Sequence, residues 1–588
     1  MSGKPRVSRR AGLLVGLVSL LGLVAAAVAP SAGAAQSAGV SASGDVKVSV
    51  GSPRALFPRN KQNEPGLAIA LNAVTPKVLA SGANEEADIE PCPQAAPQGT
   101  RCPFTAGVGT SGVYFSFDGG ASWTAPTYRG WTARNGTAHV GPIQTLPNYL
   151  EAGLVSDGDP SLAFGPRPGP NGRFSWANGA RLYYANLASN FPGKAAFNGQ
   201  EAIAVSRADD LAAAAAGDQG AWKAPVIASH PLGKNVFSDK ENVWADNAAA
   251  SPFFGNVYTC WDKDLPTTQA VVFSRSTDGG ATWSRNLALS PFVTGTALTG
   301  VIGCQIHTDS RGVVYVFWEA NDQPDHGTLE MVRSFDGGRS FTPPRSVARF
   351  VEIGKVDPAH VATGDPRFTI DGLAGARTGT SPSIDIANGA PSGGDATDEL
   401  VLNWADGRRG LNREQALLEV STDHGTTWSA PIDATTGSDR PNFPAVAISP
   451  NGSDLYLTYD AHLDPWRPTM SGARRMQGVV LHADLNANGR PGAFGVLHRG
   501  GVGDVRGSSQ NGLTAGFLGD YNYAVAARTS VSAVWNDVRD AAICPAVDRF
   551  RASLVTKHPL PPPWPGGQCP ATFGNTDIFG GTYLDPTP

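Results

Sequence analysis

Carboxylates recur at regular places along this 588-residue sequence, next to short apolar segments. Some precede an apolar segment, as Glu64, Asp159 and Asp520 do, and others follow one. Carboxylates that converge can act as general acids and bases, and together with arginine and tyrosine they can bind an anion or a sugar. Single aspartates in such places also cap turns or pair with arginine, so only their convergence would make a site.

The elements that would position these residues are short strands in a repeated unit. Four copies of Ser-x-Asp-x-Gly-x-x-Trp/Phe begin at Ser116, Ser276, Ser334 and Ser421, each after an apolar segment. The aspartate can bind backbone N–H groups of a tight turn, the glycine suits positive φ, and the aromatic ring packs the hairpin on its neighbour. These Ser-x-Asp turns therefore predict structure rather than chemistry.

A second repeat occurs seven times: an apolar strand, a turn, and another strand that ends in an aromatic and acidic cluster. Seven such units predict an all-β fold, a single β-propeller of four-stranded blades around a channel. We favour seven blades, with six as the alternative. The segment 46–50 is expected to complete the last blade beside 577–580, and the alanines of 212–216 predict a short helix.

Propeller geometry assigns the two repeats to opposite faces. First strands start and second strands end at one mouth of the channel, whereas the Ser-x-Asp turns lie between strands three and four at the other end. Carboxylates, arginines and tyrosine should therefore converge on the first mouth. The charged residues and tyrosine expected there include Glu64, Asp159, Asp239, Glu241, Asp262, Asp264, Glu319, Asp406, Arg408, Arg409, Arg440, Asp460, Asp520, Tyr521, Asp537 and Arg539.

The overall composition fits such a fold. Glycine and proline are abundant, at 70 and 46 residues, and charged residues make up only 16%, which favours many turns over long helices. The net charge of -5 and the lack of a basic run argue against a nucleic-acid partner. The sequence has no oligomerisation signature, so we expect a monomer.

Residues 1–35 have the pattern of an export signal. Arginines precede an apolar segment of residues 11–28, and Ala32-Gly33-Ala34 offers a cleavage site. Ser8-Arg9-Arg10 indicates either a twin-arginine signal or an ordinary secretory signal. No later apolar segment is long enough to span a membrane, so the propeller of residues 36–588 is predicted to be secreted.

Six cysteines in an exported chain suggest disulfides, and their spacing does not match a zinc site. Fifteen pairings are possible, and we favour the sequential one because it closes the shortest loops. Buried free thiols are the alternative. The favoured pairs are Cys92 with Cys102, Cys260 with Cys304, and Cys544 with Cys569.

With its four Ser-x-Asp turns, the chain resembles the sialidase-like (neuraminidase) superfamily of Asp-box, or BNR-repeat, propellers over nearly its whole mature length. Sialidases have six blades, and other glycanases on this scaffold have seven. The resemblance implies an exo-glycosidase in which arginines bind the substrate carboxylate, a glutamate activates a tyrosine nucleophile, and an aspartate acts as acid and base. The family's Phe/Tyr-Arg-Ile-Pro motif is absent, and Phe57-Pro58-Arg59-Asn60 stands in its place.

The resemblance also implies roles for individual residues. Tyr521 would be the nucleophile, with Glu241 or Glu319 as its partner and Asp159 or Asp239 as the acid and base. The candidate substrate-binding arginines are Arg59, Arg408 or Arg409, Arg440 and Arg539. The acidic clusters could hold a structural Ca²⁺, for which Asp262, Asp264 and Asp537 are the candidate ligands, and the chemistry requires no other cofactor.

Three functions are compatible with the sequence. The first is a secreted sialidase-like glycoside hydrolase that acts on extracellular glycans, and the second is a non-catalytic secreted propeller that binds glycan or protein. The third is a polysaccharide lyase, for which His307, His360 and His462 are candidate bases. Arginines that converge beside a Tyr–Glu hydrogen bond would favour the first function, and Asp–Arg pairs that bridge blades would favour the second.

Overall fold

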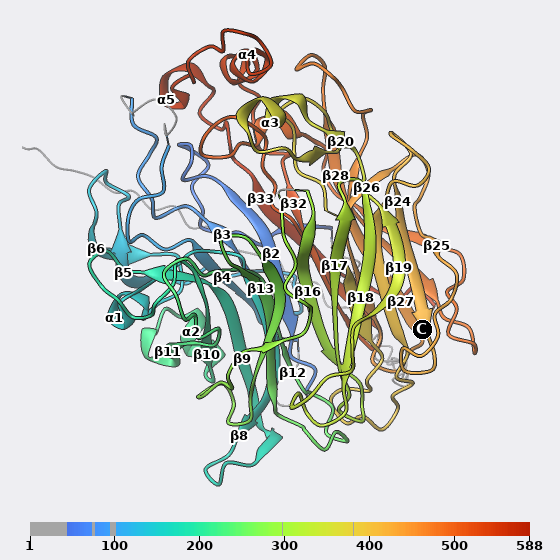
Figure 1. Ribbon diagram of the computed structural model, residues 1–588. Coiled ribbons are helices and arrows are strands. Elements are labelled where there is room, and N and C mark those ends of the chain that lie inside the picture. The colour runs from blue at the N-terminus through green and yellow to red at the C-terminus, as the bar shows by residue number, and fades with distance from the viewer. Residues whose placement is uncertain (1–43, 73–76, 95–101, 297, 380, 588) are drawn as a thin grey trace, which may run out of the picture. The chain divides into compact units, whose positions relative to one another are not determined.

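The computed structural model describes residues 44–72, 77–94, 102–296, 298–379 and 381–587. The predicted export signal lies outside these residues. Seven antiparallel sheets form blades around a channel, accompanied by two small two-stranded sheets (Figure 1). The prediction of a seven-bladed β-propeller is confirmed, and the six-bladed alternative is wrong.

The first strand of every blade lines the channel. These strands contact one another in chain order, and the last contacts the first, so the ring is closed. Their first residues face one mouth of the channel, as predicted. The first strands are β2 (Gln62–Ile69), β8 (Ser161–Pro168), β12 (Phe237–Ala245), β16 (Gly300–Thr308), β22 (Ser383–Ile386), β26 (Arg440–Ile448) and β31 (Tyr523–Ala527).

Each blade grows outward from its first strand by antiparallel pairing of strands that follow one another in the chain. The second strands are β3 (Leu79–Glu85), β9 (Phe174–Asn190), β13 (Val257–Asp264), β17 (Val314–Gln323), β23 (Leu400–Asp406), β27 (Asp454–His462) and β32 (Ser530–Asp537). The third strands are β4 (Ser111–Ser116), β10 (Ala202–Ala208), β14 (Gln269–Ser276), β18 (His326–Ser334), β24 (Gln415–Ser421), β28 (Arg475–Asp484) and β33 (Asp577–Leu584).

The outermost strands are shorter than the inner ones. The sheet of the first blade has three named strands, and its third strand makes only isolated bridges on the outer side, Phe115 with Thr124 and Gly112 with Thr145. The outermost strands of the other blades are β11 (Trp222–Ile227), β15 (Leu287–Ala288), β19 (Arg345–Val351), β25 (Ile432–Asp433), β29 (Gly495–Arg499) and β1 (Val46–Lys47).

The N-terminal strand closes the ring as predicted. β1 pairs with β33 in the register Val46 to Gly580, so the outermost strand of the seventh blade comes from the other end of the chain. The Val48 N–H continues this pairing with a 2.8 Å hydrogen bond to the carbonyl of Ile578. The blade is therefore built from both ends of the described chain.

Insertions between strands carry the remaining elements. α3 and α4 lie above the mouth where the second strands end, whereas the β8–β9 hairpin reaches the opposite side (Figure 1). The expected short helix is α2. The further elements are β5 (Tyr128–Thr132), β6 (His139–Ile143), α1 (Tyr149–Ala152), β7 (Leu154–Ser156), α2 (Leu211–Ala215), β20 (Lys355–Val356), α3 (Pro358–Thr363), β21 (Phe368–Thr369), β30 (Gly503–Asp504), α4 (Pro545–Ser553) and α5 (Pro565–Gln568).

All three predicted disulfides are present. Cys260–Cys304 links β13 to β16 and so joins the third blade to the fourth. The other two lie in an apolar cluster above the mouth, where Leu373 and Phe550 pack with the half-cystines. Because this cluster contains residues of α3 and α4, the insertions form one packed layer over the mouth.

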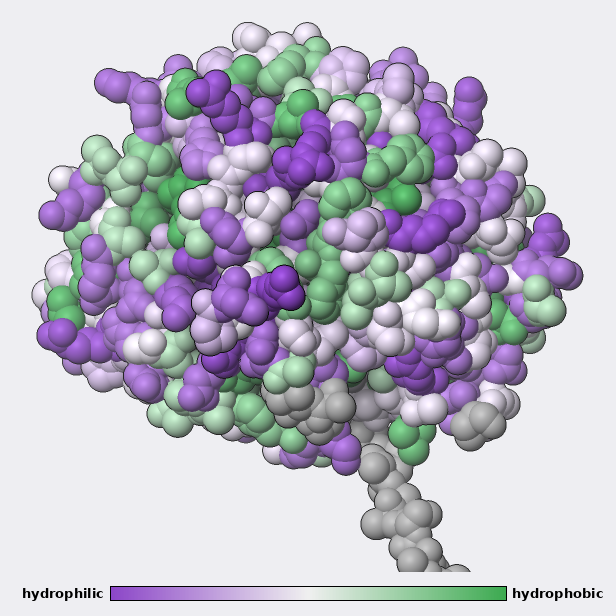
Figure 2. All heavy atoms as spheres, turned by 90° about the horizontal axis from the view of Figure 1, so that it is seen from below, coloured by the Kyte–Doolittle hydropathy of each residue, from purple (hydrophilic) through white to green (hydrophobic). Residues whose placement is uncertain are grey.

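The four Ser-x-Asp turns share one hydrogen-bond pattern, shown here for the turn after β14. The Ser276 hydroxyl donates to Asp278 Oδ1 at 2.7 Å, and the N–H groups of Ala281 and Thr282 donate to the same oxygen. Gly280 occupies the left-handed region at φ 80, which favours glycine there. The turns follow the third strands. Figure 2 shows the molecule from below, the side that the β8–β9 hairpin reaches in Figure 1, with hydrophobic residues scattered among hydrophilic ones.

An arginine from each of three successive blades holds the Ser-x-Asp turn of the next blade. Arg181 donates to the Gly279 carbonyl at 2.9 Å, and Arg275 donates to the Gly337 carbonyl at 2.9 Å. Arg333 donates to the His424 carbonyl at 2.7 Å. The Ser-x-Asp turns therefore also serve as docking points between blades.

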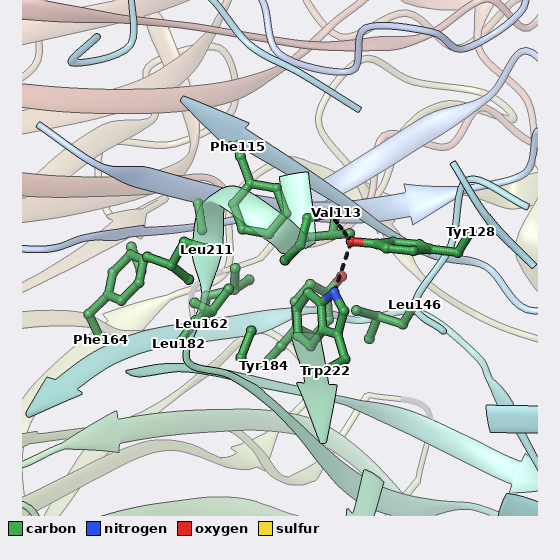
Figure 3. Close-up of a cluster of buried hydrophobic side chains, with 14 of the residues drawn as sticks. Val113, Phe115, Tyr128, Leu146, Leu162, Phe164, Leu182, Tyr184, Leu211 and Trp222 are labelled. Atoms are coloured by element: carbon green, nitrogen blue, oxygen red, sulfur yellow. Dashed lines mark hydrogen bonds between the residues drawn. The ribbon is translucent and has the colours of Figure 1, made fainter. Parts of the chain in front are cut away.

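Apolar packing between blades supplies the core. At the interface of the first two blades, Phe115 and Leu182 pack around a buried pair of rings (Figure 3). Trp222 Nε1 donates to the Tyr128 hydroxyl at 2.8 Å, and that hydroxyl donates to the Ala214 carbonyl at 2.8 Å. The polar atoms of both rings are thus satisfied inside the core, as buried polar groups require.

Candidate functional site at the channel mouth

A cavity of about 440 Å³ occupies the channel. Its polar end is formed where the first strands begin, by Lys240, Glu241, Asp520 and Tyr521 among others. Its other walls combine apolar side chains, such as those of Leu67, Leu162 and Ile384, with further polar ones. The combination of an apolar cavity and a few convergent polar groups is typical of a ligand site.

A β-bulge positions the polar residues at the start of several first strands. In β12 the register shifts between Asp239 and Asn242, so that Lys240 and Glu241 lie opposite the single residue Trp261 of β13. Lys240 lies in the left-handed region at φ 53, and Glu64 and Asp159 do so at φ 55 and 52. Non-glycine residues rarely adopt this conformation, and strained backbone of this kind clusters at functional sites.

Lys240 is the centre of a buried charge cluster. Its Nζ lies 2.7 Å from Asp520 Oδ2, 3.1 Å from Asp159 Oδ2 and 3.6 Å from Glu64 Oε1. These carboxylates come from the seventh, second and first blades. Arg377 adds a second cation at 2.9 Å from Asp520. The predicted convergence of carboxylates on this mouth is therefore present, around a lysine.

The buried carboxyl groups of this cluster have pKa values shifted in opposite directions. Burial raises the pKa of Glu64 well above its usual range, and Asp159 adds to this effect. Burial would also raise the pKa of Asp520, but Arg377 and Lys240 together hold it below its usual range. The two cations thus favour the ionised form of Asp520, whereas burial and the charge of Asp159 favour the protonated form of Glu64.

Glu241 is the most unusual carboxyl of the cavity wall. Its residue is 7% exposed, and neither of its carboxyl oxygens has a hydrogen-bond partner among the described residues. Burial raises the pKa of Glu241 well above its usual range, and the negative charge of Asp159 raises it further. A carboxyl that stays protonated in a cavity can serve as a proton donor.

Tyr521 lines the same cavity, beside Lys240. Its ring lies 5.7 Å from Lys240 Nζ and meets Tyr523 edge-on at 6.0 Å. Burial, followed by the charges of Asp159 and Glu64, raises the pKa of the Tyr521 hydroxyl well above its usual range. The described residues show no hydrogen bond between Tyr521 and a glutamate.

Of the predicted acidic residues, Asp159 and Asp239 stand behind Lys240 rather than on the cavity surface. Asp239 accepts the Lys240 N–H at 2.8 Å, and burial raises its pKa to about 6. Glu319 lines the cavity. The structure thus brings Tyr521, Glu241, Asp159 and Asp239 into one region.

The structure does not bring the four predicted arginines to the cavity. Arg408 and Arg539 belong to a repeated Trp-x-Asp-x-Arg segment at the end of a second strand. In one copy Trp404 Nε1 donates to Asp406 at 2.9 Å and Arg408 donates to the same carboxylate at 2.7 Å. Arg539 binds Asp537 in the same way at 3.0 Å. These arginines are therefore held by their own strand ends.

The other predicted arginines are also engaged elsewhere. Arg440 is buried and pairs with Glu414 at 2.7 Å, and it donates to the Ile370 carbonyl at 2.6 Å. Arg59 donates to the Ala87 carbonyl at 3.2 Å, and Arg409 pairs with Asp433 at 3.3 Å. The arginines that do line the cavity are Arg367 and Arg377.

The structure does not join the three candidate calcium ligands into one site. Asp537 is bound by Arg539, and Asp262 accepts the Gly303 N–H at 2.9 Å. Asp264 is partly buried at the end of β13. None of the three belongs to a group of metal-compatible side chains among the described residues.

One of the three candidate histidines lines the cavity. His307 stacks on Trp244 with ring centres 3.9 Å apart, and its Nδ1 lies 3.1 Å from Asp385. His360 and His462 lie outside the cavity lining, and burial lowers their pKa values to about 4 and about 3. These two are therefore neutral at physiological pH.

Sequence reasoning missed Arg367 and Arg377. Both come from the insertion between the fourth and fifth blades. This insertion has no counterpart in the other blades, so the sequence repeat gave no position for its residues. The sequence placed Lys240 at the mouth between Asp239 and Glu241, but nothing in it indicated that this lysine would pair with carboxylates from three other blades. No helix of the described residues is long and apolar enough to cross a membrane.

No protein-family model matches the sequence, and no curated protein matches it. Several solved structures resemble the chain at low sequence identity. The Hadza microbial sialidase Hz136 matches at 12% identity with a TM-score of 0.37, over 68% of this chain and 63% of that one. The NanB sialidase from Streptococcus pneumoniae matches at 11% identity and a TM-score of 0.36, over 71% of this chain and 66% of that one.

An α-L-arabinanase from Penicillium chrysogenum matches at 15% identity and a TM-score of 0.31, over 50% of this chain and 74% of that one. The chain spans less than two thirds of the length of the Hadza sialidase. The seven blades and four Ser-x-Asp turns of this structure make its fold a β-propeller of the kind that the sialidase resemblance implies.

Proposed function

We propose that this protein is an exported glycoside hydrolase of the sialidase-like type, whose reaction takes place in the channel cavity. One observation carries the proposal: the cavity lining holds two carboxyl groups, Glu241 and Asp520, whose pKa values are shifted in opposite directions, upward for Glu241 and downward for Asp520. Glycoside hydrolysis uses two carboxyl groups in different protonation states, and divergent environments create that difference.

The residues can be given roles in such a reaction. Glu241 would donate its proton to the glycosidic oxygen as the bond to the anomeric carbon breaks. The Tyr521 hydroxyl would attack that carbon and pass its proton to a neighbouring carboxylate such as Asp159. A water molecule, deprotonated by the Glu241 carboxylate, would then attack the anomeric carbon and break the glycosyl–tyrosine bond, and Asp159 would return its proton to the Tyr521 oxygen. Lys240 and Arg377 would hold Asp520 ionised beside the positive charge that develops on the sugar ring.

The finer proposal is that the substrate is a sialoside in extracellular glycans. Arg367 and Arg377 are the cavity groups that could meet the carboxylate of such a sugar. Arg377 already lies 2.9 Å from Asp520, so the substrate would have to compete for it. Export by the signal of residues 1–35 is part of the same proposal.

The test is an assay of the secreted mature protein on a fluorogenic sialoside and then on a panel of other glycans. Glu241→Gln should lower kcat/KM by about 10²–10⁴, because general acid catalysis contributes that much. Glu151→Gln, which changes an exposed glutamate of α1, should leave the rate unchanged. Turnover of other glycans but not of the sialoside would contradict the proposed substrate. Lack of turnover on every glycan of the panel would contradict the proposed hydrolase activity.

The alternative proposal is a non-catalytic propeller that binds glycan or protein at the same mouth. It is favoured by the fact that Arg408, Arg440 and Arg539 are all engaged in Asp or Glu pairs. Binding without turnover on a glycan array, weakened by substitution of Tyr521 with alanine and unaffected by Glu241→Gln, would support this alternative over the hydrolase.

A further inference from the structure

A cluster of acidic residues and one histidine lies at the other end of the propeller, away from the channel mouth. It begins on the β27–β28 hairpin, where Asp454 pairs with Asp484 and Tyr456 pairs with His482. Because side chains two residues apart share a face of a strand, these four side chains project from the same side of the sheet. That side packs against the seventh blade, with Tyr456 and Tyr583 in one cluster.

The seventh blade contributes a further carboxylate. Asp585 directly follows β33, and its carboxylate lies 3.6 Å from His482 Nε2. The same nitrogen lies 3.0 Å from Asp454 and 3.8 Å from Asp484. One ligand atom from each of these four residues lies within 4.8 Å of the others. The side chains of His482, Asp454 and Asp585 are at most 6% exposed.

A separate observation points to a missing ligand. The Tyr456 hydroxyl is buried and has no hydrogen-bond partner among the described residues. Its ring lies 5.1 Å from that of His482. Tyr456 is two residues from Asp454 and pairs with His482 across the strands, so its side chain lies on the same face of the sheet as the cluster. A buried polar group without a partner calls for a bound ion or water.

The cluster also lacks cations. Among the described residues, the three carboxylates pair with His482 and with no lysine or arginine. The similar group of Asp309, Asp398 and His424 differs in this respect. There Arg311 lies 3.4 Å from Asp309 and 3.8 Å from Asp398, so a protein cation already supplies positive charge.

We propose that Asp454, His482, Asp484 and Asp585 bind one divalent transition-metal ion, such as Zn²⁺ or Mn²⁺. Three carboxylates and an imidazole form a mixed oxygen and nitrogen ligand set, which suits these ions better than Ca²⁺. The Tyr456 hydroxyl would bind a water on the ion. Because Asp585 belongs to the seventh blade and the other ligands belong to the sixth, the bound ion would link the two blades.

The test uses the mature protein after dialysis against a chelator. Zn²⁺ and Mn²⁺ are added separately, bound metal is measured by mass spectrometry, and the melting temperature is followed. We expect saturation at one equivalent and a rise in melting temperature, because a ligand that binds only the folded state stabilises it. Asp484→Asn should weaken the affinity at least about tenfold.

Two further variants make the result decisive. Asp325→Asn removes an exposed aspartate that also pairs with a histidine, outside the cluster, and should bind metal as the wild type does. His482→Gln should weaken the metal affinity at least as much as Asp484→Asn does, whatever the effect of the substitution on stability. Absence of stoichiometric binding, or equal affinity in the wild type and both cluster variants, would overturn the proposal.

Discussion

Lys240 Nζ lies 2.7 Å from Asp520 Oδ2, so an ion pair joins the third blade to the seventh across the mouth of the channel. These blades are not neighbours in the ring, where adjacent first strands pack side by side. Asp159 and Glu64 bring the second and first blades to the same lysine. The cluster therefore braces the ring from within as well as building the polar end of the cavity.

Replacing Lys240 with methionine should destabilise the protein strongly. The change would leave Asp520 and Asp159 buried without their shared cation, and breaking a buried ion pair by removing one partner costs about 3–5 kcal/mol. The free energy of unfolding from urea titration measures the effect. Lys223→Met is the control, because Lys223 is 53% exposed and lies 4.0 Å from Asp209. A similar loss in both variants would contradict the bracing role.

Glu241 should make the stability of the protein fall as the pH rises. Its folded-state pKa is raised, so the folded protein holds a proton that the unfolded chain releases above about pH 4.3. Stability contributed by this group is full below that pH and is lost toward the folded pKa, at up to about 1.4 kcal/mol per pH unit.

Glu241→Gln should remove this part of the pH dependence. Unfolding free energies measured between acidic and neutral pH should fall less steeply for this variant than for the wild type. Glu151→Gln, which changes an exposed glutamate, should keep the wild-type slope. Parallel curves for all three proteins would show that Glu241 is ionised in the folded state.

Much of the fold could be predicted because repetition makes weak signals add. A single apolar strand followed by an acidic cluster does not predict a fold, but seven copies of this unit predict seven blades. The same repetition placed Asp159, Glu241 and Tyr521 at one mouth, since equivalent positions in every blade share a face. The closure by β1 followed from counting strands in the last blade.

The arginines could not be assigned in this way. Arg408 and Arg539 occupy equivalent positions in two blades, and the Trp-x-Asp-x-Arg pattern that they share marks a structural repeat. Arg377 reaches the cavity from an insertion between two blades, so its position depends on how that insertion packs over the mouth. Residues that occur once in a repeat protein are the hardest to place from sequence.

The Cys260–Cys304 disulfide should stabilise the protein more than Cys92–Cys102. The first closes 44 residues and the second 10, and loop closure entropy gives about 4 and about 3 kcal/mol for loops of these lengths. Replacing each pair with alanines should lower the melting temperature in that order. A larger loss of melting temperature on removal of Cys92–Cys102 would show that Cys260–Cys304 contributes less stability than its loop length predicts.

Asp278 should matter for stability and not for activity. Its carboxylate accepts N–H groups of Ala281 and Thr282, much as a helix N-cap does, and losing such a cap costs about 1–2 kcal/mol. The Ser-x-Asp turns lie between third and fourth strands, away from the cavity lining. Asp278→Ala should therefore lower the melting temperature and leave kcat/KM on any substrate found unchanged.

Asp118→Ala, in the first blade, should behave in the same way, because its carboxylate accepts the Ser122 N–H at 2.9 Å. A fall in kcat/KM at a temperature where the variants are fully folded would show that these turns reach the site.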